Sequence, residues 1–479
     1  VAFSIDGRTF TCEGPLTSSH PTGSYATITT DDGRLLLAQV LGTSRSPASG
    51  DPGQRIVVGN GSLMAELVDG DPRPIEAPRA FAAGIVAPAQ PEVVSRHLRA
   101  TLGSSAAIEI GEIRSADGVP ALLKASGFGR HTFMCGQSGS GKTYTLGLIL
   151  EQLLLETKIQ IAVIDPNSDY VSLAQLRPAE ELGLDDAEYA ELRSRYEPLA
   201  ERVHSLGEGH ARPLRTWFGR LGIDQQAMVL GLDPARDAGE YHAFMRMVEQ
   251  LADADYSIED VQVATRNSFD DDARRLGRRI DNLGIAGLSI WASHDQPSTR
   301  DVLGDDWRLA VADIGSLSGA RESAIASASI LEILWERRRE RRPVLLVIDE
   351  AHNVCPQHPL DDNQALATEH VIRIAGEGRK FGMYLLLSTQ RPDKVHPQVL
   401  SQCDNLIVMK MNSANDLGIL ADTFSYTPRS LIEQAPGFGL GEGLAAGKVA
   451  PDPFLFRSGT RLTVEGGTDV PATWAHRRD

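Results

Sequence analysis

Hydrophobic and polar residues alternate in short runs over roughly the first 120 residues, which is the pattern of half-buried strands. Two hairpin signals stand out. Residues 25–30 and 35–41 flank Asp31-Asp-Gly-Arg34, and residues 55–58 and 63–68 flank Gly59-Asn-Gly61. A further strand is expected at 107–113. Several short strands at this spacing indicate a small barrel or sandwich, and we predict an N-terminal β-barrel over residues 1–120.

The spacing of hydrophobic residues along the chain changes from His131 onward. A short apolar strand is followed by a glycine-rich turn, a helical segment over 144–156 and another apolar strand at 159–165. Strand, helix and strand at this length predict a βαβ unit with a parallel sheet. We therefore expect the first part of an α/β core over residues 121–171.

The rest of the chain divides by its hydrophobic period. Residues 172–305 have helical periodicity and are rich in Ala, Leu, Arg, Asp and Glu, which predicts a helical insertion. Strand-like runs separated by helical stretches then complete the α/β core over residues 306–450, with a C-terminal extension over 451–479. The predicted strands of this second part are residues 308–314, 343–349, 383–389 and 405–410.

Composition narrows the class of protein. Hydrophobic residues make up 42% and charged residues 23% of the 479 residues, so a fibrous or disordered chain is excluded. The net charge of -17 argues against coating nucleic acid with the whole surface, although a local basic channel stays compatible with it. Four scattered cysteines do not make a disulfide framework, and neither a membrane-spanning run nor a signal peptide is visible. We expect a cytoplasmic protein with no membrane partner.

The strongest motif is Gly136-Gln-Ser138-Gly139-Ser140-Gly141-Lys142-Thr143, a complete G-x-x-x-x-G-K-[ST] between a predicted strand and a predicted helix. Such glycines let backbone N–H groups surround phosphate oxygens at a helix N-terminus. Lys142 would neutralise the β- and γ-phosphates, and Thr143 would hold Mg²⁺. The motif predicts binding of ATP with Mg²⁺.

A second motif is the run 344–348 followed by Asp349 and Glu350. A buried strand delivers both carboxylates at its C-terminal end, where α/β sheets bind ligands. Asp349 would bind Mg²⁺ through its water shell, and Glu350 would activate the attacking water. The string Asp349-Glu-Ala-His352 is also typical of a helicase box of another superfamily, but the long gap from Lys142 and the lack of a second α/β domain argue against that class.

Three further residues are candidates for the nucleotide site. Gln390 ends a predicted strand beside the P-loop strand and would sense the γ-phosphate or orient water. Arg379, held between glycines at a strand entrance, is suited to act as an arginine finger across a subunit boundary. Arg130, shortly before the P-loop strand, is a weaker candidate of the same kind. An ordinary strand end and two surface arginines are the alternatives.

A basic run and a group of His and Cys residues could suggest binding sites, but the sequence favours a structural explanation for each. The run Arg337-Arg-Arg-Glu-Arg-Arg342 fits a solvated helix end stabilised by the helix dipole, with nucleic-acid binding as the alternative. Lys394 is a second weak candidate for DNA contact. His352, Cys355 and His358 would need a fourth ligand to hold zinc, so a metal site there is not expected.

With these strings in place, the chain resembles the HerA branch of the HerA/FtsK superfamily of hexameric ATPases. The resemblance rests on segments 130–143, 163–170, 346–352, 374–382 and 388–405. The segment 163–170 departs from the family, because Asp165-Pro-Asn-Ser-Asp169-Tyr170 stands where the family has Asp-Pro-His-Gly-Glu-Tyr. The departure puts in doubt any role carried over for the missing His, Gly and Glu.

The resemblance implies a RecA-like core in a six-membered ring around DNA. It implies that Arg379 acts in trans and that Arg130 also reaches the nucleotide. It further implies a partner, either a nuclease in DNA-end processing or an effector in antiphage defence. We expect a homo-hexameric ATPase that translocates along DNA as a helicase. The alternative is an ATP-responsive scaffold that assembles and regulates a defence effector without processive motion on DNA.

Overall fold

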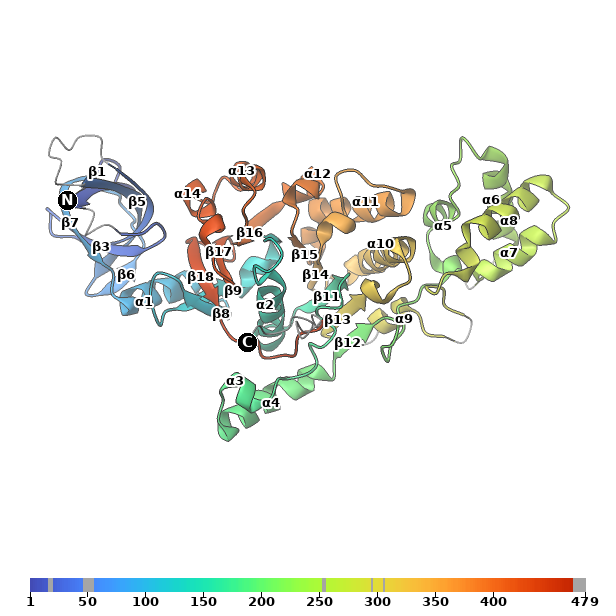
Figure 1. Cartoon of the computed structure of the whole chain (residues 1–479), viewed down its shortest axis with the longest axis horizontal. Coiled ribbons are helices and arrows are strands. Elements are labelled where there is room, and N and C mark those ends of the chain that lie inside the picture. The colour runs from blue at the N-terminus through green and yellow to red at the C-terminus, as the bar shows by residue number, and fades with distance from the viewer. Residues whose placement is uncertain (16–19, 46–55, 252–255, 294–295, 305, 468–479) are drawn as a thin grey trace, which may run out of the picture. The chain divides into compact units, whose positions relative to one another are not determined.

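The computed structural model describes residues 1–15, 20–45, 56–251, 256–293, 296–304 and 306–467 (Figure 1). The chain divides into two compact units. The first contains Val1–Thr157, Gln390–Asp393 and Cys403–Arg461, and the second contains Lys158–Thr389, Lys394–Gln402 and Leu462–Asp479. Among the described helices, none combines the length and the apolar character that a membrane span requires.

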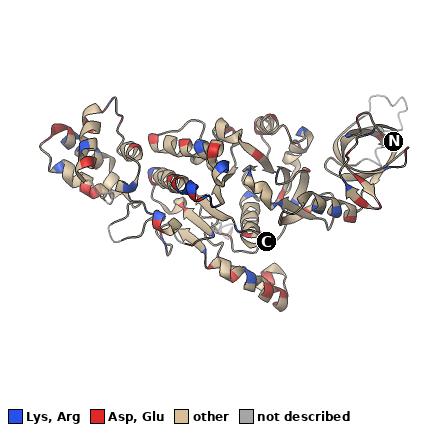
Figure 2. Ribbon diagram, turned by 180° about the vertical axis from the view of Figure 1, so that it is seen from behind, with Lys and Arg blue, Asp and Glu red and all other residues tan. Residues whose placement is uncertain are grey.

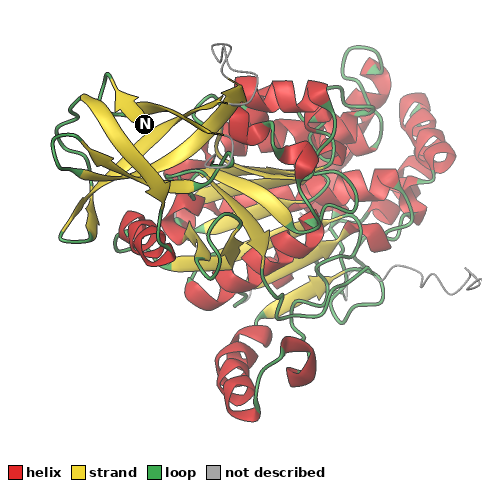
Figure 3. Ribbon diagram, turned by 60° about the vertical axis from the view of Figure 1, so that its left-hand side comes forward, coloured by secondary structure: helices red, strands yellow, loops and turns green. Residues whose placement is uncertain are grey.

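The predicted N-terminal barrel is present in the first unit. Its strands follow the order β2-β1-β7-β3-β4-β5, and pairing of β2 with β5 closes the sheet, with β6 attached to β5. Figure 3 shows these strands, in yellow, around the N-terminus. The interior is filled by apolar side chains that alternate along the strands, among them Phe10, Ile28 and Leu36. The strands are β1 (Ala2–Ser4), β2 (Thr9–Pro15), β3 (Tyr25–Thr30), β4 (Leu35–Arg45), β5 (Ile56–Val68), β6 (Asp71–Arg73) and β7 (Phe81–Pro88).

One predicted hairpin of the barrel is confirmed and the other is wrong. β3 and β4 pair across the expected Asp-Gly turn. Residues 56–68, however, form the single strand β5 rather than two strands with a turn at Gly59-Asn-Gly61. The glycines serve close packing instead, because a Cβ on Gly61 would lie 2.0 Å from the carbonyl oxygen of Gln39.

The barrel also ends earlier than predicted. After β7 the chain forms α1 (Pro91–Leu102) and then β8 (Ala107–Ile113) and β9 (Pro120–Lys124). β8 pairs with β18 (Phe454–Ser458) and β9, so the expected strand at 107–113 belongs to the sheet of the P-loop strand. Alternating hydrophobicity predicts a strand but does not tell which sheet the strand joins.

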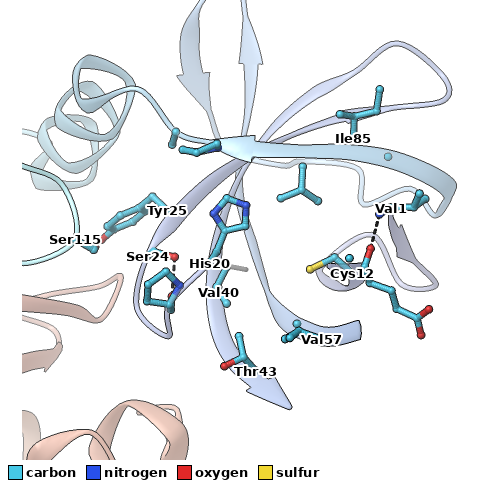
Figure 4. A pocket seen from close by; sticks show the side chains of 18 residues that line it. Val1, Cys12, His20, Ser24, Tyr25, Val40, Thr43, Val57, Ile85 and Ser115 are labelled. Carbon is cyan, nitrogen blue, oxygen red and sulfur yellow. Dashed lines mark hydrogen bonds between the residues drawn. The ribbon is translucent and has the colours of Figure 1, made fainter. Parts of the chain in front are cut away.

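A cavity of about 880 Å³ is lined mainly by barrel strands, and Figure 4 shows its lining. The hydroxyl of Tyr25 is buried and has no hydrogen-bond partner among the described residues. Apolar side chains such as Val40 and Ile85 line the cavity beside Ser24 and His20. The barrel strands therefore line a recess of their own.

The P-loop part of the first unit is a mixed sheet in the order β10-β16-β17-β18-β8-β9. β10 (His131–Cys135) is parallel to β16 (Cys403–Met409), and the other pairs are antiparallel. β18 therefore extends this sheet into the segment predicted as a C-terminal extension. The other elements of this part are α2 (Lys142–Glu156), α13 (Ala414–Thr423), α14 (Arg429–Ile432) and β17 (Glu442–Gly447).

The second unit is built on a parallel sheet in the order β12-β13-β11-β14-β15. The strands β11, β13, β14 and β15 are mostly apolar and buried, as expected where both faces of a sheet are covered, whereas the edge strand β12 also contains His204 and Ser205. The strands are β11 (Gln160–Asp165), β12 (Val203–Leu206), β13 (Leu309–Asp313), β14 (Val344–Ile348) and β15 (Met383–Thr389), and the helices that follow β13, β14 and β15 are α10 (Ala320–Glu336), α11 (Asp362–Glu377) and α12 (Pro397–Leu400).

The predicted insertion over 172–305 is mostly helical, with one exception. Strand β12 interrupts it and joins the parallel sheet beside β13. Acidic and basic residues are interspersed on its helices (Figure 2), many of them in ion pairs such as Arg279 with Asp237. The helices are α3 (Ala179–Leu182), α4 (Asp186–Ala200), α5 (Ile223–Val229), α6 (Ala238–Leu251), α7 (Ile258–Arg266), α8 (Asp271–Leu283) and α9 (Thr299–Gly304).

Candidate nucleotide-binding and hydrolysis site

The predicted phosphate-binding loop joins the end of β10 to the start of α2. Gly139 and Gly141 have φ of 72° and 86°, a left-handed conformation that glycine adopts at no steric cost. Gly141 caps α2, so the helix begins at Lys142 and Thr143. The sequence therefore folds here as the motif predicts, with the loop leading directly into a helix N-terminus.

The loop is fixed by neighbouring backbone of the same unit. The N–H of Gln137 donates to the carbonyl oxygen of Lys410 at 2.9 Å, and the N–H of Gly441 donates to the carbonyl oxygen of Ser140 at 3.0 Å. A Cβ on Gly136 would lie 2.6 Å from the Cβ of Met409. The glycines thus permit close packing as well as the turn, and the loop is preorganised.

Polar groups of the loop fit an anion. The Oγ of Ser140 is fully buried and has no hydrogen-bond partner among the described residues. Lys142 is only 5% exposed although it carries a charge. A buried donor, a buried ammonium group and the N-terminus of α2 together suit phosphate oxygens. Ser138 and Gly139 complete the loop.

Arg130 lies before β10 in the same unit. Its guanidinium is 3.6 Å from a carboxylate oxygen of Asp404, and both side chains are nearly half exposed. An exposed pair of this kind contributes little to stability. Arg130 therefore has the accessibility that contact with another molecule requires, and its predicted role stays a prediction.

Three carboxylates stand at the C-terminal ends of adjacent strands in the second unit. Asp165 ends β11, Asp313 ends β13 and Asp349 directly follows β14, and all three are buried. Because these strands are parallel and in register, their C-terminal ends meet at one edge of the sheet. From the sequence, Asp349 is predicted to bind Mg²⁺ and Asp165 is matched to a family segment, whereas Asp313 is not singled out, although an apolar run ending in Asp is visible at all three positions.

Tyr170 links two of these carboxylates. Its hydroxyl donates to Asp349 Oδ2 at 3.2 Å, and its N–H donates to Asp165 Oδ2 at 2.9 Å. Tyr170 is fully buried, so both contacts are shielded from water. The tyrosine therefore orients the carboxylate that is predicted to bind Mg²⁺, a role that the sequence did not reveal.

The segment that departs from the family pattern keeps an unusual backbone. Ser168 has a φ of 61°, which is uncommon for a residue with a side chain. Its hydroxyl donates to Asp313 Oδ1 at 2.8 Å, and Asp313 Oδ2 lies 2.9 Å from His210 Nε2. The left-handed turn that suits glycine is therefore retained with serine, held by a hydrogen bond.

Burial raises the pKa of Asp165 from 3.8 to about 7, against the opposing effect of backbone donors. The folded state then binds this proton more tightly than the unfolded state does. The associated stability is fully present below about pH 4 and is lost as the pH rises through about 7. In nucleotide-free protein, Asp165→Asn should therefore gain stability relative to wild type between about pH 5 and about pH 8.

Thermal unfolding midpoints of both proteins across this pH range check the prediction. As the pH rises, the free energy of unfolding of Asp165→Asn should increase relative to that of wild type. The increase should be no more than about 1.4 kcal/mol per pH unit. Asp186→Asn, at an exposed helix start, serves as the control. A difference for Asp165→Asn that does not change with pH would contradict the proposed proton linkage.

The other residues predicted for the nucleotide site, Glu350, Gln390 and Arg379, lie at different ends of strands β14 and β15. Glu350 follows Asp349 and is 6% exposed. Gln390 follows the end of β15 and is exposed. Arg379 is exposed on the short turn Gly378–Phe381 before β15, at the opposite edge of the parallel sheet from Asp349. Within the second unit, Asp349 and Glu350 are thus adjacent and Arg379 is remote from them.

The contacts of the basic run Arg337-Arg-Arg-Glu-Arg-Arg342 support its interpretation as a helix end rather than a nucleic-acid contact. Arg337 pairs with Glu340 at 3.0 Å, and the guanidinium of Arg338 lies over the ring of Trp335 at 4.5 Å.

Cys355 is buried, and its Sγ contacts the carbonyl oxygen of Ala351 at 3.4 Å. Over the described parts of the chain, no cluster of three metal-ligating side chains occurs.

The fold and the loop define a P-loop ATPase. VirB4 of Thermoanaerobacter pseudethanolicus is similar in structure, with a TM-score of 0.50 at 15% identity over 74% of this chain and 96% of that one. The conjugative coupling protein TrwB is similar with a TM-score of 0.50 at 14% identity over 80% of this chain and 94% of that one. These likenesses confirm the predicted α/β P-loop fold.

Residues 108–358, more than half of the chain, match the family described as "Helicase HerA, central domain". The chain belongs to this family. It is 24% identical to the DNA double-strand break repair helicase HerA of Sulfolobus acidocaldarius over 74% of this chain and 70% of that protein. It is 29% identical to the HerA of Sulfurisphaera tokodaii over 31% of each chain. The predicted resemblance to the HerA branch is confirmed.

Proposed function

We propose that the chain is the subunit of a homo-hexameric, Mg²⁺-dependent ATPase that translocates along DNA. The observation that carries the proposal is the phosphate loop, with its buried Ser140 hydroxyl and Lys142 at the start of α2. Membership of the HerA family adds the expectation of DNA, because the related archaeal proteins are named as DNA repair helicases.

The proposed chemistry assigns one role to each group. Lys142 and the loop N–H groups bind the phosphates of ATP, while Thr143 and Asp349 are the groups suited to hold Mg²⁺. The ion would supply charge neutralisation on the phosphate oxygens. Glu350 accepts a proton from the attacking water, and Gln390 helps to orient that water. Tyr170 keeps Asp349 in place.

Assembly into a ring completes the proposed site. Arg379 of one subunit would contact the nucleotide of its neighbour, and Arg130 is a second candidate for that contact. A contact of this heterologous kind, repeated around an axis, closes into a ring. Loss of the γ-phosphate would then change a contact that two subunits share, which is a route from hydrolysis to movement.

The proposed partners follow from the family and the barrel. DNA would pass through the centre of the ring, where a locally basic lining is compatible with the net charge of -17. In the sequence of residues 1–120 we find no catalytic constellation, so we assign this segment to assembly or to docking of a protein partner. That partner would be a nuclease in DNA-end processing or an effector in antiphage defence.

Binding of duplex DNA at graded salt concentrations, on protein whose mass in solution is measured, tests this proposal. A translocase grips phosphates, so log K should fall with log[salt] at a slope of about 0.9 per phosphate contacted. A hexamer with a steep slope is the expected result. A protein that stays monomeric with ATP and Mg²⁺ and binds no DNA at low salt would contradict the proposal.

A further inference from the structure

A short turn before β17 exposes one large apolar side chain. The turn covers residues 439–442 of the first unit, and the N–H of Glu442 donates to the carbonyl oxygen of Gly439 at 3.2 Å. Gly441 has a φ of 72°, a left-handed conformation that glycine adopts at no steric cost. Leu440 lies at the tip and is 76% exposed. Because both its neighbours in the chain are glycines, no adjacent side chain covers it.

This turn is joined directly to the phosphate loop. The N–H of Gly441 donates to the carbonyl oxygen of Ser140 at 3.0 Å. A Cβ on Gly141 would lie 2.9 Å from the backbone nitrogen of Gly441 and 3.5 Å from Cδ1 of Leu440. Since Gly141 caps α2, the leucine side chain lies next to the helix N-terminus that is suited to bind phosphates.

Side-chain contacts hold the turn in place. Oε2 of Glu442 accepts from the N–H of Gly439 at 2.9 Å. The same carboxylate, 12% exposed, pairs with Arg114 at 3.4 Å and with Arg457 at 3.3 Å. The guanidinium of Arg114 also lies 5.6 Å from the ring centroid of the buried Phe438. A side chain on a turn fixed in this way is preorganised, so a ligand that covers it orders little else on binding.

The base of a nucleotide is the ligand group that fits this position. A nucleoside triphosphate is charged at its phosphates, and its largest apolar surface is the face of its base. The N–H groups of Gly439 and Gly441 are already used within the turn and in its contact with the loop, so they offer no donor to the polar edge of a base. The turn can instead offer apolar contact to the ring face, and removing an exposed leucine from water is favourable.

We propose that Leu440 binds the face of the nucleotide base while the phosphate loop binds the phosphates. The inference rests on the proposed ATPase function, in which the loop is occupied by the phosphates of ATP. The leucine adds affinity for the nucleoside part of the ligand and takes no part in the proposed hydrolysis chemistry. Its effect therefore belongs to binding and is measurable without turnover.

Calorimetric binding of ADP and of inorganic tripolyphosphate, each with Mg²⁺, tests this contact on the full chain. Leu440→Ser should weaken ADP binding about 10-fold, which corresponds to about 1.4 kcal/mol of lost apolar contact, and should leave tripolyphosphate binding within about twofold of wild type. Leu440→Met keeps an apolar side chain of similar volume and should retain the affinity for ADP. Ile5→Ser, at a barrel residue that is 86% exposed, is the control and should bind both ligands as wild type does.

The possible outcomes separate this inference from the proposed function. If wild type binds neither ADP nor tripolyphosphate, the proposed ATPase function fails. If wild type binds ADP and Leu440→Ser binds it equally well, the inference about Leu440 is wrong and the ATPase assignment stands. Equal losses for ADP and tripolyphosphate would show that Leu440 supports the loop, and a smaller assembly mass for Leu440→Ser would show that a neighbouring copy covers it. Either result, or an equal loss of ADP affinity in Leu440→Met, would overturn the inference.

Discussion

Glu350→Gln should leave ATP binding intact and lower ATP turnover by about 10²–10⁴-fold, the usual contribution of a positioned general base. Glutamine has nearly the shape of glutamate, so the left-handed turn at Glu350 and its hydrogen bond to Asp349 can persist. An amide, however, cannot accept a proton from the attacking water. The defect should therefore lie in the chemical step alone.

Nucleotide affinity and single-turnover hydrolysis are the measurements for this variant. Glu377→Gln, at the exposed end of α11, is the control and should behave as wild type. Hydrolysis by Glu350→Gln near the wild-type rate would show that another group acts as the base. Loss of nucleotide binding would show instead that Glu350 supports the fold of the site.

Arg379→Ala should bind ATP and hydrolyse it about 10³–10⁵-fold more slowly, the range that arginine fingers contribute in other NTPases. The geometry of the second unit favours action in trans. Arg379 precedes β15, Asp349 follows β14, and these parallel strands pair in register from Val344 with Met383. A strand of this length spans about 16 Å, so the arginine does not reach the carboxylates of its own sheet.

Mixing subunits tests the direction of this contact. Lys142→Ala subunits should fail to bind ATP but keep a normal Arg379, and Arg379→Ala subunits keep a normal phosphate loop. Mixed rings should regain part of the activity, because an intact loop can then face an intact arginine. No recovery, despite demonstrated mixing, would indicate a role in cis. Lys380→Ala, at the neighbouring exposed position, should leave turnover unchanged.

Features encoded by adjacent residues could be predicted from the sequence. The phosphate loop and the hairpin at Asp31-Asp-Gly-Arg34 depend on local backbone preferences, and both formed as expected. Gly59 and Gly61 carry the same local signal as a turn, but their conformation depends on Gln39 and Cys12, which pack against them from other strands. Local pattern alone does not separate these two uses of glycine.

Features that depend on distant pairing could not be predicted. Strand β8 joins β18, more than three hundred residues away in the chain, rather than the barrel that precedes it. Tyr170 donates to Asp349 across a separation of 179 residues, and no periodicity signals such a contact. His352 was considered only as a zinc ligand, although the structure places it beside Glu350 and Thr389.

If ATP hydrolysis by this chain is coupled to DNA, ATP turnover of the purified protein should differ with and without duplex DNA. The assay should run at low salt, since phosphate contacts weaken steeply as salt rises. It should be repeated with the protein that co-purifies. DNA should raise turnover, and Glu350→Gln should abolish the rise. Turnover that responds to the protein partner while DNA neither binds nor stimulates, even with that partner present, would rule out a DNA translocase and favour an ATP-responsive scaffold.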